Sequence, residues 1–142
     1  MIGQICSKPP VTASPDTTVR EAAHRMWTRK VGAVVVVNGR GKPIGVLTDR
    51  DIAVKVVAQG GDPAVVRVGS LITRTPTVIH ESAGILDATK LLSRRGVRRL
   101  PVVSQSGKLV GIISLDDLLM LIGSELGHIA STLASELGRS RI

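Results

Sequence analysis

The chain has 142 residues, 43% of them hydrophobic, which is enough for one domain or for two halves that share a core. Phe and Tyr are absent and Trp27 stands alone, so the core must be aliphatic, and binding to nucleic acid by stacking several bases on aromatic rings is disfavoured. A formal net charge of +8 favours phosphate-bearing or acidic partners without choosing among RNA, an acidic protein and a nucleotide.

An internal repeat with an offset of 66 positions runs through most of the chain. We predict that residues 1–61 form the first repeat, residues 62–126 the second repeat and residues 127–142 a C-terminal tail. Identical residues recur at this offset without a gap, and they include the pairs Gly3 and Gly69, Pro10 and Pro76, Ala22 and Ala88, Arg29 and Arg95, Val36 and Val102, Gly45 and Gly111, and Asp51 and Asp117.

The first repeat begins with an extended segment over residues 11–13 and a helix that starts near Thr18. Thr18 and Glu21 fit a capping box, and Val19, Ala22 and Met26 share one helix face. The β-branched run that follows predicts a strand buried on both faces. The remaining predicted elements are a strand over 33–37, a hairpin connection over 38–42, a strand over 43–47, a helix over 49–58 and a connector over 59–63.

The second repeat has the same order of elements. We predict an extended segment over 77–79, a helix over 83–94, strands over 100–103 and 108–114, and a helix that opens at Leu115. That helix either continues past Gly123 or breaks there, because Gly123 and Gly127 both weaken it. Residues 135–142 have no clear packing pattern, and we expect them to be mobile.

A hydroxyl residue and an acid recur where a strand passes into a helix in each repeat. Thr48 precedes Asp51 by three positions, and Ser114 precedes Asp117 by three. This spacing is typical of a helix cap, which stabilises its helix by about 1 kcal/mol. The same geometry suits a nucleoside phosphate, since a hydroxyl can donate to phosphate and a carboxylate can accept from two ribose hydroxyls.

Glycines and arginines near these junctions bear on the choice between the two interpretations. Gly45 and Gly111, on the preceding strands, leave room for another backbone or for a flat base. Arg98 and Arg99 precede the strand next to Ser114, where two guanidinium groups suit phosphate binding better than a solvated surface role.

These motifs resemble the cystathionine beta-synthase (CBS) domain, which occurs as a tandem pair called a Bateman module. The resemblance rests on Gly45-Val46-Leu47-Thr48-Asp49-Arg50-Asp51 and Gly111-Ile112-Ile113-Ser114-Leu115-Asp116-Asp117, and it extends over nearly the whole chain. The arginine pair is also similar to a nucleotide-binding repeat of the gamma subunit of AMP-activated protein kinase. The resemblance implies an α/β (α+β) fold of two β-α-β-β-α repeats, related by a pseudo-twofold axis, with two three-stranded sheets packed together and two clefts between the halves.

By the same resemblance, the clefts would bind an adenosine ligand such as AMP, ADP, ATP, S-adenosylmethionine or a dinucleotide such as NAD. Asp51 and Asp117 would hold ribose, Thr48 and Ser114 would contact phosphate or ribose, and Arg98 and Arg99 would bind phosphate. Thr12, Val78 and Ile79 would border the adenine. The first repeat has Gly32 and Ala33 in place of the arginine pair, so its cleft would depend on Arg50 or Lys8. We therefore expect the second cleft, with Arg98, Arg99, Ser114 and Asp117, to bind better.

The expected function is that of a regulatory ligand sensor without catalysis, in contact with an effector protein that the sequence does not identify. An alternative is a basic interaction module that binds nucleic acid or an acidic protein while its clefts stay empty. No nucleophile motif points to an enzyme, and neither the three histidines nor Cys6 has metal-ligand spacing.

The sequence also leads to expectations about the oligomeric state and the cellular compartment of the protein. A homodimer could form through the faces Val19-Ala22-Met26 and Ile85-Ala88-Leu92, although both faces could instead be used by the core of one chain. One cysteine allows no intrachain disulfide, and the uninterrupted apolar runs are too short to cross a bilayer. We therefore expect a cytoplasmic protein without a membrane partner.

Overall fold

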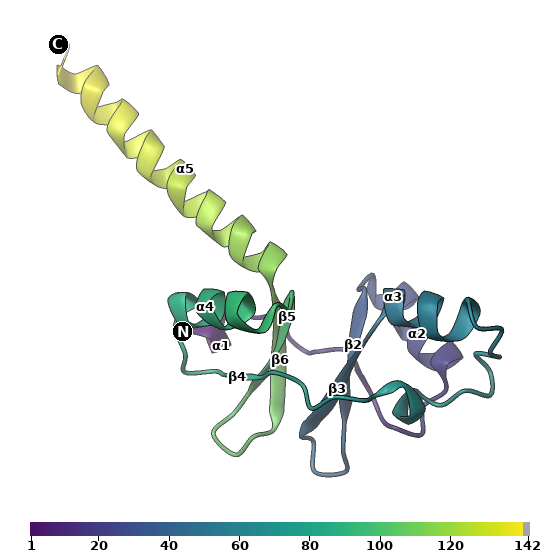
Figure 1. Cartoon of the computed structure of the whole chain (residues 1–142). Coiled ribbons are helices and arrows are strands. Elements are labelled where there is room, and N and C mark those ends of the chain that lie inside the picture. Colours follow the sequence, from purple (N-terminus) through teal and green to yellow (C-terminus); the bar gives the residue numbers. More distant parts are fainter. Residues whose placement is uncertain (141–142) are drawn as a thin grey trace.

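The computed structural model describes residues 1–140, and it contains the two three-stranded sheets that the sequence predicts (Figure 1). The sheets have the strand orders β1-β2-β3 and β4-β5-β6, one from each repeat. The elements in chain order are α1 (Ile2–Ile5), β1 (Thr12–Ala13), α2 (Val19–Arg29), β2 (Ala33–Val37), β3 (Pro43–Thr48), α3 (Asp49–Ile52), the π-helix η1 (Ala53–Val57), the 3-10 helix η2 (Val68–Leu71), β4 (Ile79–His80), α4 (Ile85–Arg95), β5 (Arg99–Val103), β6 (Leu109–Ser114) and α5 (Leu115–Ser140).

The two sheets share one register. In each, a short first strand pairs in parallel with the central strand, which pairs antiparallel with the third. The central strands are buried, as expected for continuous β-branched runs, and both shift register at the same place in the repeat, after Val36 and after Val102. The hairpins turn at Gly41 and Gly107, whose positive φ angles of 75° and 82° favour glycine.

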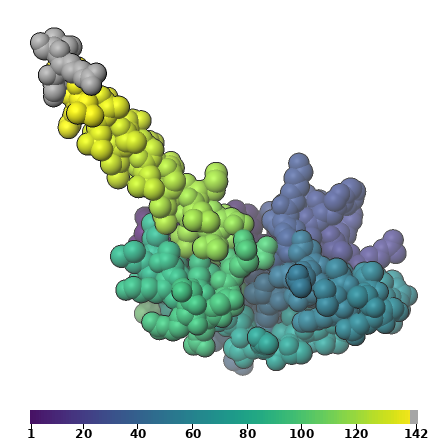
Figure 2. Space-filling model, turned by 45° about the horizontal axis from the view of Figure 1, so that its top comes forward, coloured from purple at the N-terminus to yellow at the C-terminus, as the bar shows by residue number. Residues whose placement is uncertain are grey.

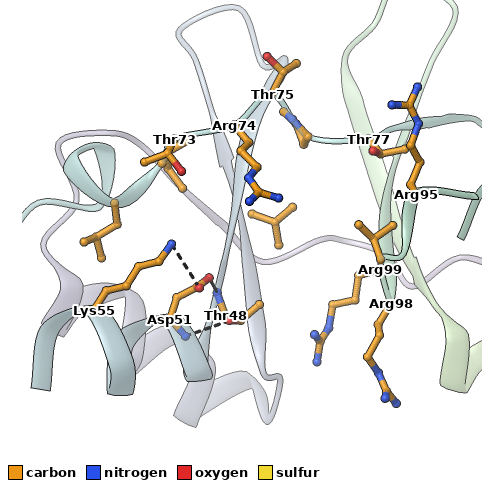
Figure 3. Close-up of a pocket in the computed structure, with 15 residues that line it drawn as sticks. Thr48, Asp51, Lys55, Thr73, Arg74, Thr75, Thr77, Arg95, Arg98 and Arg99 are labelled. Atoms are coloured by element: carbon orange, nitrogen blue, oxygen red, sulfur yellow. Dashed lines mark hydrogen bonds and ion pairs between the residues drawn. The ribbon is translucent and has the colours of Figure 1, made fainter. Parts of the chain in front are cut away.

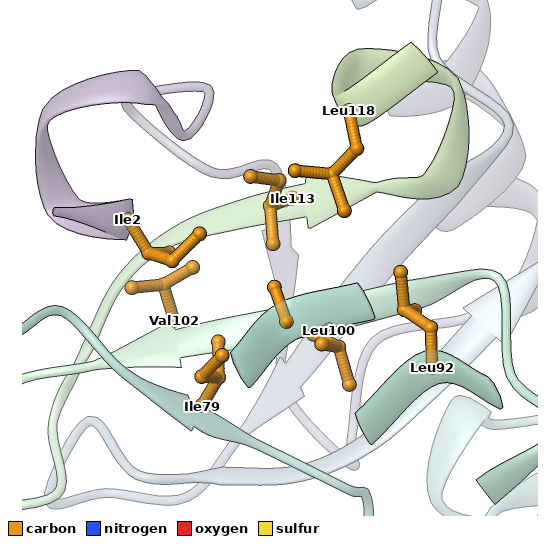
Figure 4. Close-up of a cluster of buried hydrophobic side chains, with 8 residues drawn as sticks. Ile2, Ile79, Leu92, Leu100, Val102, Ile113 and Leu118 are labelled. Carbon is orange, nitrogen blue, oxygen red and sulfur yellow. The ribbon is translucent and has the colours of Figure 1, made fainter. Parts of the chain in front are cut away.

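The N-terminal segment of each repeat packs on the other repeat. Ile2 is fully buried in a core cluster that otherwise consists of second-repeat residues (Figure 4). Val68 is likewise buried in the core of the first repeat. Backbone hydrogen bonds fix this exchange, from the Gly3 N–H to the Glu81 carbonyl at 2.8 Å and from the Gly69 N–H to the Pro15 carbonyl at 2.9 Å. The exchange ties the two halves together and brings the connector across β3.

The helix faces that we expected to form a dimer interface lie in the core of the single chain. Val19 and Ala22 are fully buried, and Met26 is 6% exposed. On α4, Ala88 is fully buried and Leu92 is 4% exposed. Of the two outcomes left open by the sequence, the structure therefore supports use of both faces by the core of one chain.

The C-terminal helix is longer than expected. α5 continues past Gly123 and Gly127 to Ser140, so the predicted boundary at residue 127 falls inside a helix, as do residues 135–140; residues 141 and 142 lie outside the described part. Figure 2 shows this helix projecting from the body as a rod. Over Leu115–Arg139 it is also long and apolar enough to cross a membrane, because small residues rather than charges separate its large aliphatic ones. Uninterrupted apolar runs did not reveal this property.

Candidate functional site

The hydroxyl and acid motif starts a helix in both repeats. The Thr48 hydroxyl accepts from the Asp51 N–H at 3.1 Å, and the Asp51 carboxylate accepts from the Thr48 N–H at 3.0 Å. Ser114 and Asp117 form the same pair of hydrogen bonds, at 3.1 and 2.8 Å. The capping interpretation is therefore correct for both copies, and any role in ligand binding is additional to it.

A cleft with a volume of about 860 Å³ lies between the repeats, and we call it the arginine cleft (Figure 3). Its volume falls within the usual range for small-molecule sites. Its lining residues come from β3, α3 and η1 of the first repeat, from the end of η2 and the connector before β4, and from the segment that runs from the last residue of α4 to the first residue of β5. They are Val46, Thr48, Asp51, Lys55, Leu71, Ile72, Thr73, Arg74, Thr75, Pro76, Thr77, Arg95, Val97, Arg98 and Arg99.

The arginine cleft is strongly cationic. Five of its lining residues carry a positive charge, Lys55, Arg74, Arg95, Arg98 and Arg99, whereas Asp51 is its single carboxylate. In Figure 3 the side chains of Lys55 and Asp51 lie on one side of the cleft, and those of Arg98 and Arg99 lie on the other. An excess of cations facing one cavity favours a ligand with several negative charges.

Asp51 is held in its charged form. Partial burial by itself would raise the pKa of this carboxyl, but the hydrogen bonds from Thr48 and the Lys55 ammonium group outweigh burial and lower the pKa below its ordinary value of 3.8. The Lys55 Nζ atom lies 3.5 Å from Asp51 Oδ1. The cleft therefore presents a fixed anionic acceptor, suited to hydroxyl groups, beside a cationic wall.

Arg98 and Arg99 lie beside a different hydroxyl and acid pair from the one that we expected. Arg98 and Arg99 line the same cleft as Thr48 and Asp51, not a cleft with Ser114 and Asp117. Although Arg99 pairs with Ser114 along the sheet, its guanidinium group reaches the first repeat, and Nη2 would lie 3.3 Å from a Cβ atom built on Gly32. The arginines thus lie at the hydroxyl and acid pair of the first repeat, and the expected grouping of Arg98 and Arg99 with Ser114 and Asp117 is wrong.

Arg98 makes a weak contact outside the cleft. Its Nη2 atom lies 3.4 Å from Asp116 Oδ1, and both side chains are largely exposed. An exposed ion pair of this kind contributes at most about 1 kcal/mol. A phosphate in the cleft could therefore compete with Asp116 for this guanidinium group.

The other predicted site residues lie outside the lining of the arginine cleft. Ile79 is 5% exposed and belongs to the hydrophobic core, so it cannot border a ligand there. Thr12 is on β1, where its carbonyl accepts from Arg25, and Arg50 is exposed on α3. Val78 directly follows the connector residues that do line the cleft. The segment beside the cavity is thus residues 71–77, earlier in the chain than predicted.

Three cations of the cleft, Lys55, Arg74 and Arg95, are not among the site residues predicted from the sequence. A signal existed for one of them, since Arg74 stands in a run of hydroxyl residues, Thr73-Arg74-Thr75-Pro76-Thr77, whose composition suits phosphate binding. Lys55 and Arg95 lie on helices with ordinary charge patterns, and only the arrangement of the two repeats places them at one cavity.

The two strand glycines make room for the protein's own chain. A Cβ atom on Gly45 would lie 2.5 Å from Ile72 Cγ2, and one on Gly111 would lie 2.5 Å from Cys6 Sγ. Of the two possibilities, close approach of another segment is therefore the one observed. At Gly45 this packing positions the connector that lines the arginine cleft.

Comparison with known proteins agrees with the fold. Two spans of the chain, residues 2–58 and 68–124, match the CBS domain. The chain is 43% identical to the CBS domain-containing protein YhcV of Bacillus subtilis over 111 residues, which cover 75% of this chain and 74% of YhcV. It is 36% identical over 120 residues to an uncharacterized protein of Methanopyrus kandleri, covering 84% of this chain but only 61% of that relative.

Two similar solved structures contain adenosine compounds. The CBS domain pair of protein MJ0100, in complex with 5-methylthioadenosine and S-adenosyl-L-methionine, superposes with a TM-score of 0.78 at 28% identity, covering 88% of this chain and 97% of that one. CBSX2 in complex with AMP superposes with a TM-score of 0.73 at 27% identity, covering 87% and 96%. Neighbours with this fold therefore bind nucleotides or nucleosides.

Proposed function

Because the chain belongs to the CBS domain family and carries two copies of that domain, we propose that it is a non-catalytic regulatory protein that binds an adenosine nucleotide in the arginine cleft. The observation that carries this proposal is the meeting of Thr48 and Asp51 from one repeat with Arg98 and Arg99 from the other. AMP bound to CBSX2 and the two adenosine compounds bound to MJ0100 support an adenosine ligand.

Each part of the cleft suits one part of such a ligand. Asp51, kept charged by Thr48 and Lys55, would accept from the two ribose hydroxyls. Arg98 and Arg99 would bind phosphate oxygens, and Arg74 would approach them from the connector. The apolar side chains of Val46 and Ile72 offer a surface for the adenine base.

Charge favours a phosphorylated ligand over S-adenosylmethionine. Five cations face one carboxylate in the cleft, whereas the sulfonium group of S-adenosylmethionine is itself positive and 5-methylthioadenosine carries no phosphate. Every further phosphate would add charge-assisted hydrogen bonds, each contributing about 1.5–3 kcal/mol at a desolvated site. We therefore expect ATP and ADP to bind more tightly than AMP, and AMP more tightly than S-adenosylmethionine.

Thermal unfolding of the full chain with each of these compounds tests the proposal. A ligand that binds only the native state stabilises it by about 2.7 kcal/mol at a hundredfold excess over its dissociation constant. We expect the melting temperature to rise most with ATP. No rise with any of the compounds would contradict adenosine binding, and the largest rise with S-adenosylmethionine would contradict the charge argument.

The alternative of a basic module that binds nucleic acid makes a different prediction. Five of the 19 Lys and Arg residues face one cavity, and this concentration favours a small phosphate ligand over an extended strand. Titration with single-stranded RNA at two salt concentrations separates the cases, because binding to many phosphates weakens steeply with salt. Salt-sensitive RNA binding that ATP does not displace would favour the alternative.

A further inference from the structure

The projecting half of α5 exposes a continuous apolar face. Beyond Leu118, which is 1% exposed and anchors the helix in the core, large aliphatic side chains face solvent along its length. Their exposures range from 40% at Ile122 to 67% at Leu137. Only 6% of the residues in the apolar stretch of the helix are buried. A helix with so large an apolar face needs a partner surface to cover it.

The spacing of these residues is that of a coiled-coil seam. Leucine or isoleucine recurs at alternating intervals of three and four residues, at Leu119, Ile122, Leu126, Ile129 and Leu133. This period of 3.5 keeps one stripe facing a parallel or antiparallel helix, whereas packing on a globular core requires 3.6. The face is therefore built for another long helix.

The polar residues beside the seam indicate which long helix is the partner. Glu125 and Arg139 are two heptads apart and occupy the same heptad position. In an antiparallel pair whose twofold axis lies at Ser131, Ile129 of each chain packs against Leu133 of the other, and Glu125 lies near Arg139 of the other chain on the same side of the seam. Glu136 also lies at a seam position, and a parallel pair would place it against its own copy, whereas this antiparallel pair places it against Leu126 and avoids the repulsion of like charges. We propose that α5 is a dimerisation helix that pairs antiparallel with α5 of a second copy of this chain.

Small residues next to the seam fit the same register. Gly123 faces Leu137 of the second copy in this pairing, so a large side chain meets a position with no side chain. A Cβ atom on Gly123 would meet nothing within 4 Å in the single chain, so the core of this chain gives no reason for a glycine there. The pairing also leaves the two bodies at opposite ends of the helix pair, since α5 points away from its own body (Figure 1).

A bilayer is the competing partner, and the polar side of the helix disfavours it. Glu125 and His128 lie in the middle of the apolar stretch, with Oε1 and Nδ1 3.9 Å apart. Ionisable residues at the centre of a single membrane span are costly. In an antiparallel pair, Glu125 flanks the seam and His128 lies on the outer side of the helix, so both remain in water.

Light scattering of the full chain at micromolar concentration tests the pairing. We expect twice the mass of 14.9 kDa for the wild type and the mass of one chain for Leu126→Glu and for Ile129→Glu. Met120→Glu is the matched control, because Met120 is 77% exposed on the side of α5 away from the seam, and it should stay dimeric. Glu125→Arg should weaken the dimer, and Glu125→Arg combined with Arg139→Glu should restore it.

The outcomes that overturn the proposal are distinct. A monomeric wild type, or a dimer that Leu126→Glu and Ile129→Glu leave intact, contradicts pairing through α5. A dimer that the charge exchange fails to restore contradicts the antiparallel register. A monomer that sediments with vesicles of phosphatidylcholine and phosphatidylglycerol, and loses this property in Leu126→Glu, would assign the helix to a bilayer instead.

Discussion

The arginine cleft and the equivalent surface around Ser114 and Asp117 share one scaffold and differ in charge. In both, a hydroxyl and an acid cap the helix after the third strand with nearly the same hydrogen bonds. The backbone carbonyl before the central strand also accepts from the first helical N–H in each, from Asp49 to Gly32 and from Leu115 to Arg98. The motif that stands out in the sequence is thus a structural device that both copies need.

The two sites differ in the residues of the other repeat that face the hydroxyl and the acid. At the positions equivalent to Arg98 and Arg99, the first repeat has Gly32 and Ala33, so the surface around Ser114 has no arginine pair facing it. Leu121 likewise replaces Lys55 one turn after the acid. Duplication preserved the helix cap, and we infer that phosphate binding was kept or gained at the arginine cleft alone.

Removal of both arginines should abolish tight binding. In Arg98→Ala/Arg99→Ala, the loss of two charge-assisted contacts of about 1.5–3 kcal/mol each should weaken ATP binding at least about a hundredfold. Calorimetric titration measures this change. Arg94→Ala is the control, since Arg94 is a helix residue outside the cleft lining. Unchanged affinity in the double variant would remove the arginine pair from the site.

Substitution of the two acids should distinguish their role in helix capping from a role in ligand binding. Asp51→Ala and Asp117→Ala each lose one cap hydrogen bond, so both should lower the free energy of unfolding by about 1 kcal/mol. Only Asp51→Ala should also weaken ATP binding, by about tenfold or more, because only Asp51 faces the arginines. Chemical unfolding and titration of both variants provide the two readouts. Stronger loss of binding in Asp117→Ala would restore the ranking expected from sequence.

Substitution of either strand glycine should destabilise the fold, but only one of the two substitutions should also weaken ATP binding. In Gly45→Ala the new methyl group meets Ile72, and in Gly111→Ala it meets Cys6 and Ser7. Overpacking of this kind costs about 1–3 kcal/mol, so both variants should be destabilised. Gly45→Ala alone should also lower affinity for ATP, since it displaces the connector. Equal affinities in the two variants would show that the connector does not shape the site.

The smallest effect concerns acid stability. Because the folded-state pKa of Asp51 is lowered, its charged form stabilises the fold above about pH 4, and this contribution is lost as the pH falls through the folded pKa. Asp51→Asn should therefore be less sensitive than the wild type to a fall in pH from about 5 to 3. Unfolding in denaturant across this range measures the difference. Identical pH profiles would show that Asp51 has no such linkage.

Local patterns in the sequence predicted most of the fold and only part of the site. The repeat, the buried strands and the caps at Thr18, Thr48 and Ser114 each depend on residues close together in the chain, and the structure confirms them. The location of Arg99 and Asp51 at one cleft instead depends on how the two repeats pack together, to which the exchange of N-terminal segments contributes. That exchange rests on the burial of Ile2 and Val68, whose partners lie far along the chain.

Two further outcomes concern Ile79 and the C-terminal helix. Ile79 has the position in sequence of a cleft residue, but the parallel pairing of β4 with β5 turns it into the core. α5 continues through Gly123 and Gly127 because each glycine costs only about 1 kcal/mol relative to alanine, whereas the long run of leucine, isoleucine and alanine favours a helix. Neither outcome could be decided by a rule applied to single residues.

The stoichiometry of ATP binding shows whether one repeat or both bind nucleotide. Calorimetric titration of the full chain should give one ATP per chain, and Arg98→Ala/Arg99→Ala should abolish that binding while Asp117→Ala leaves it intact. Two equivalent sites per chain, or a single site that depends on Asp117 and not on the arginines, would contradict the assignment of nucleotide binding to the arginine cleft.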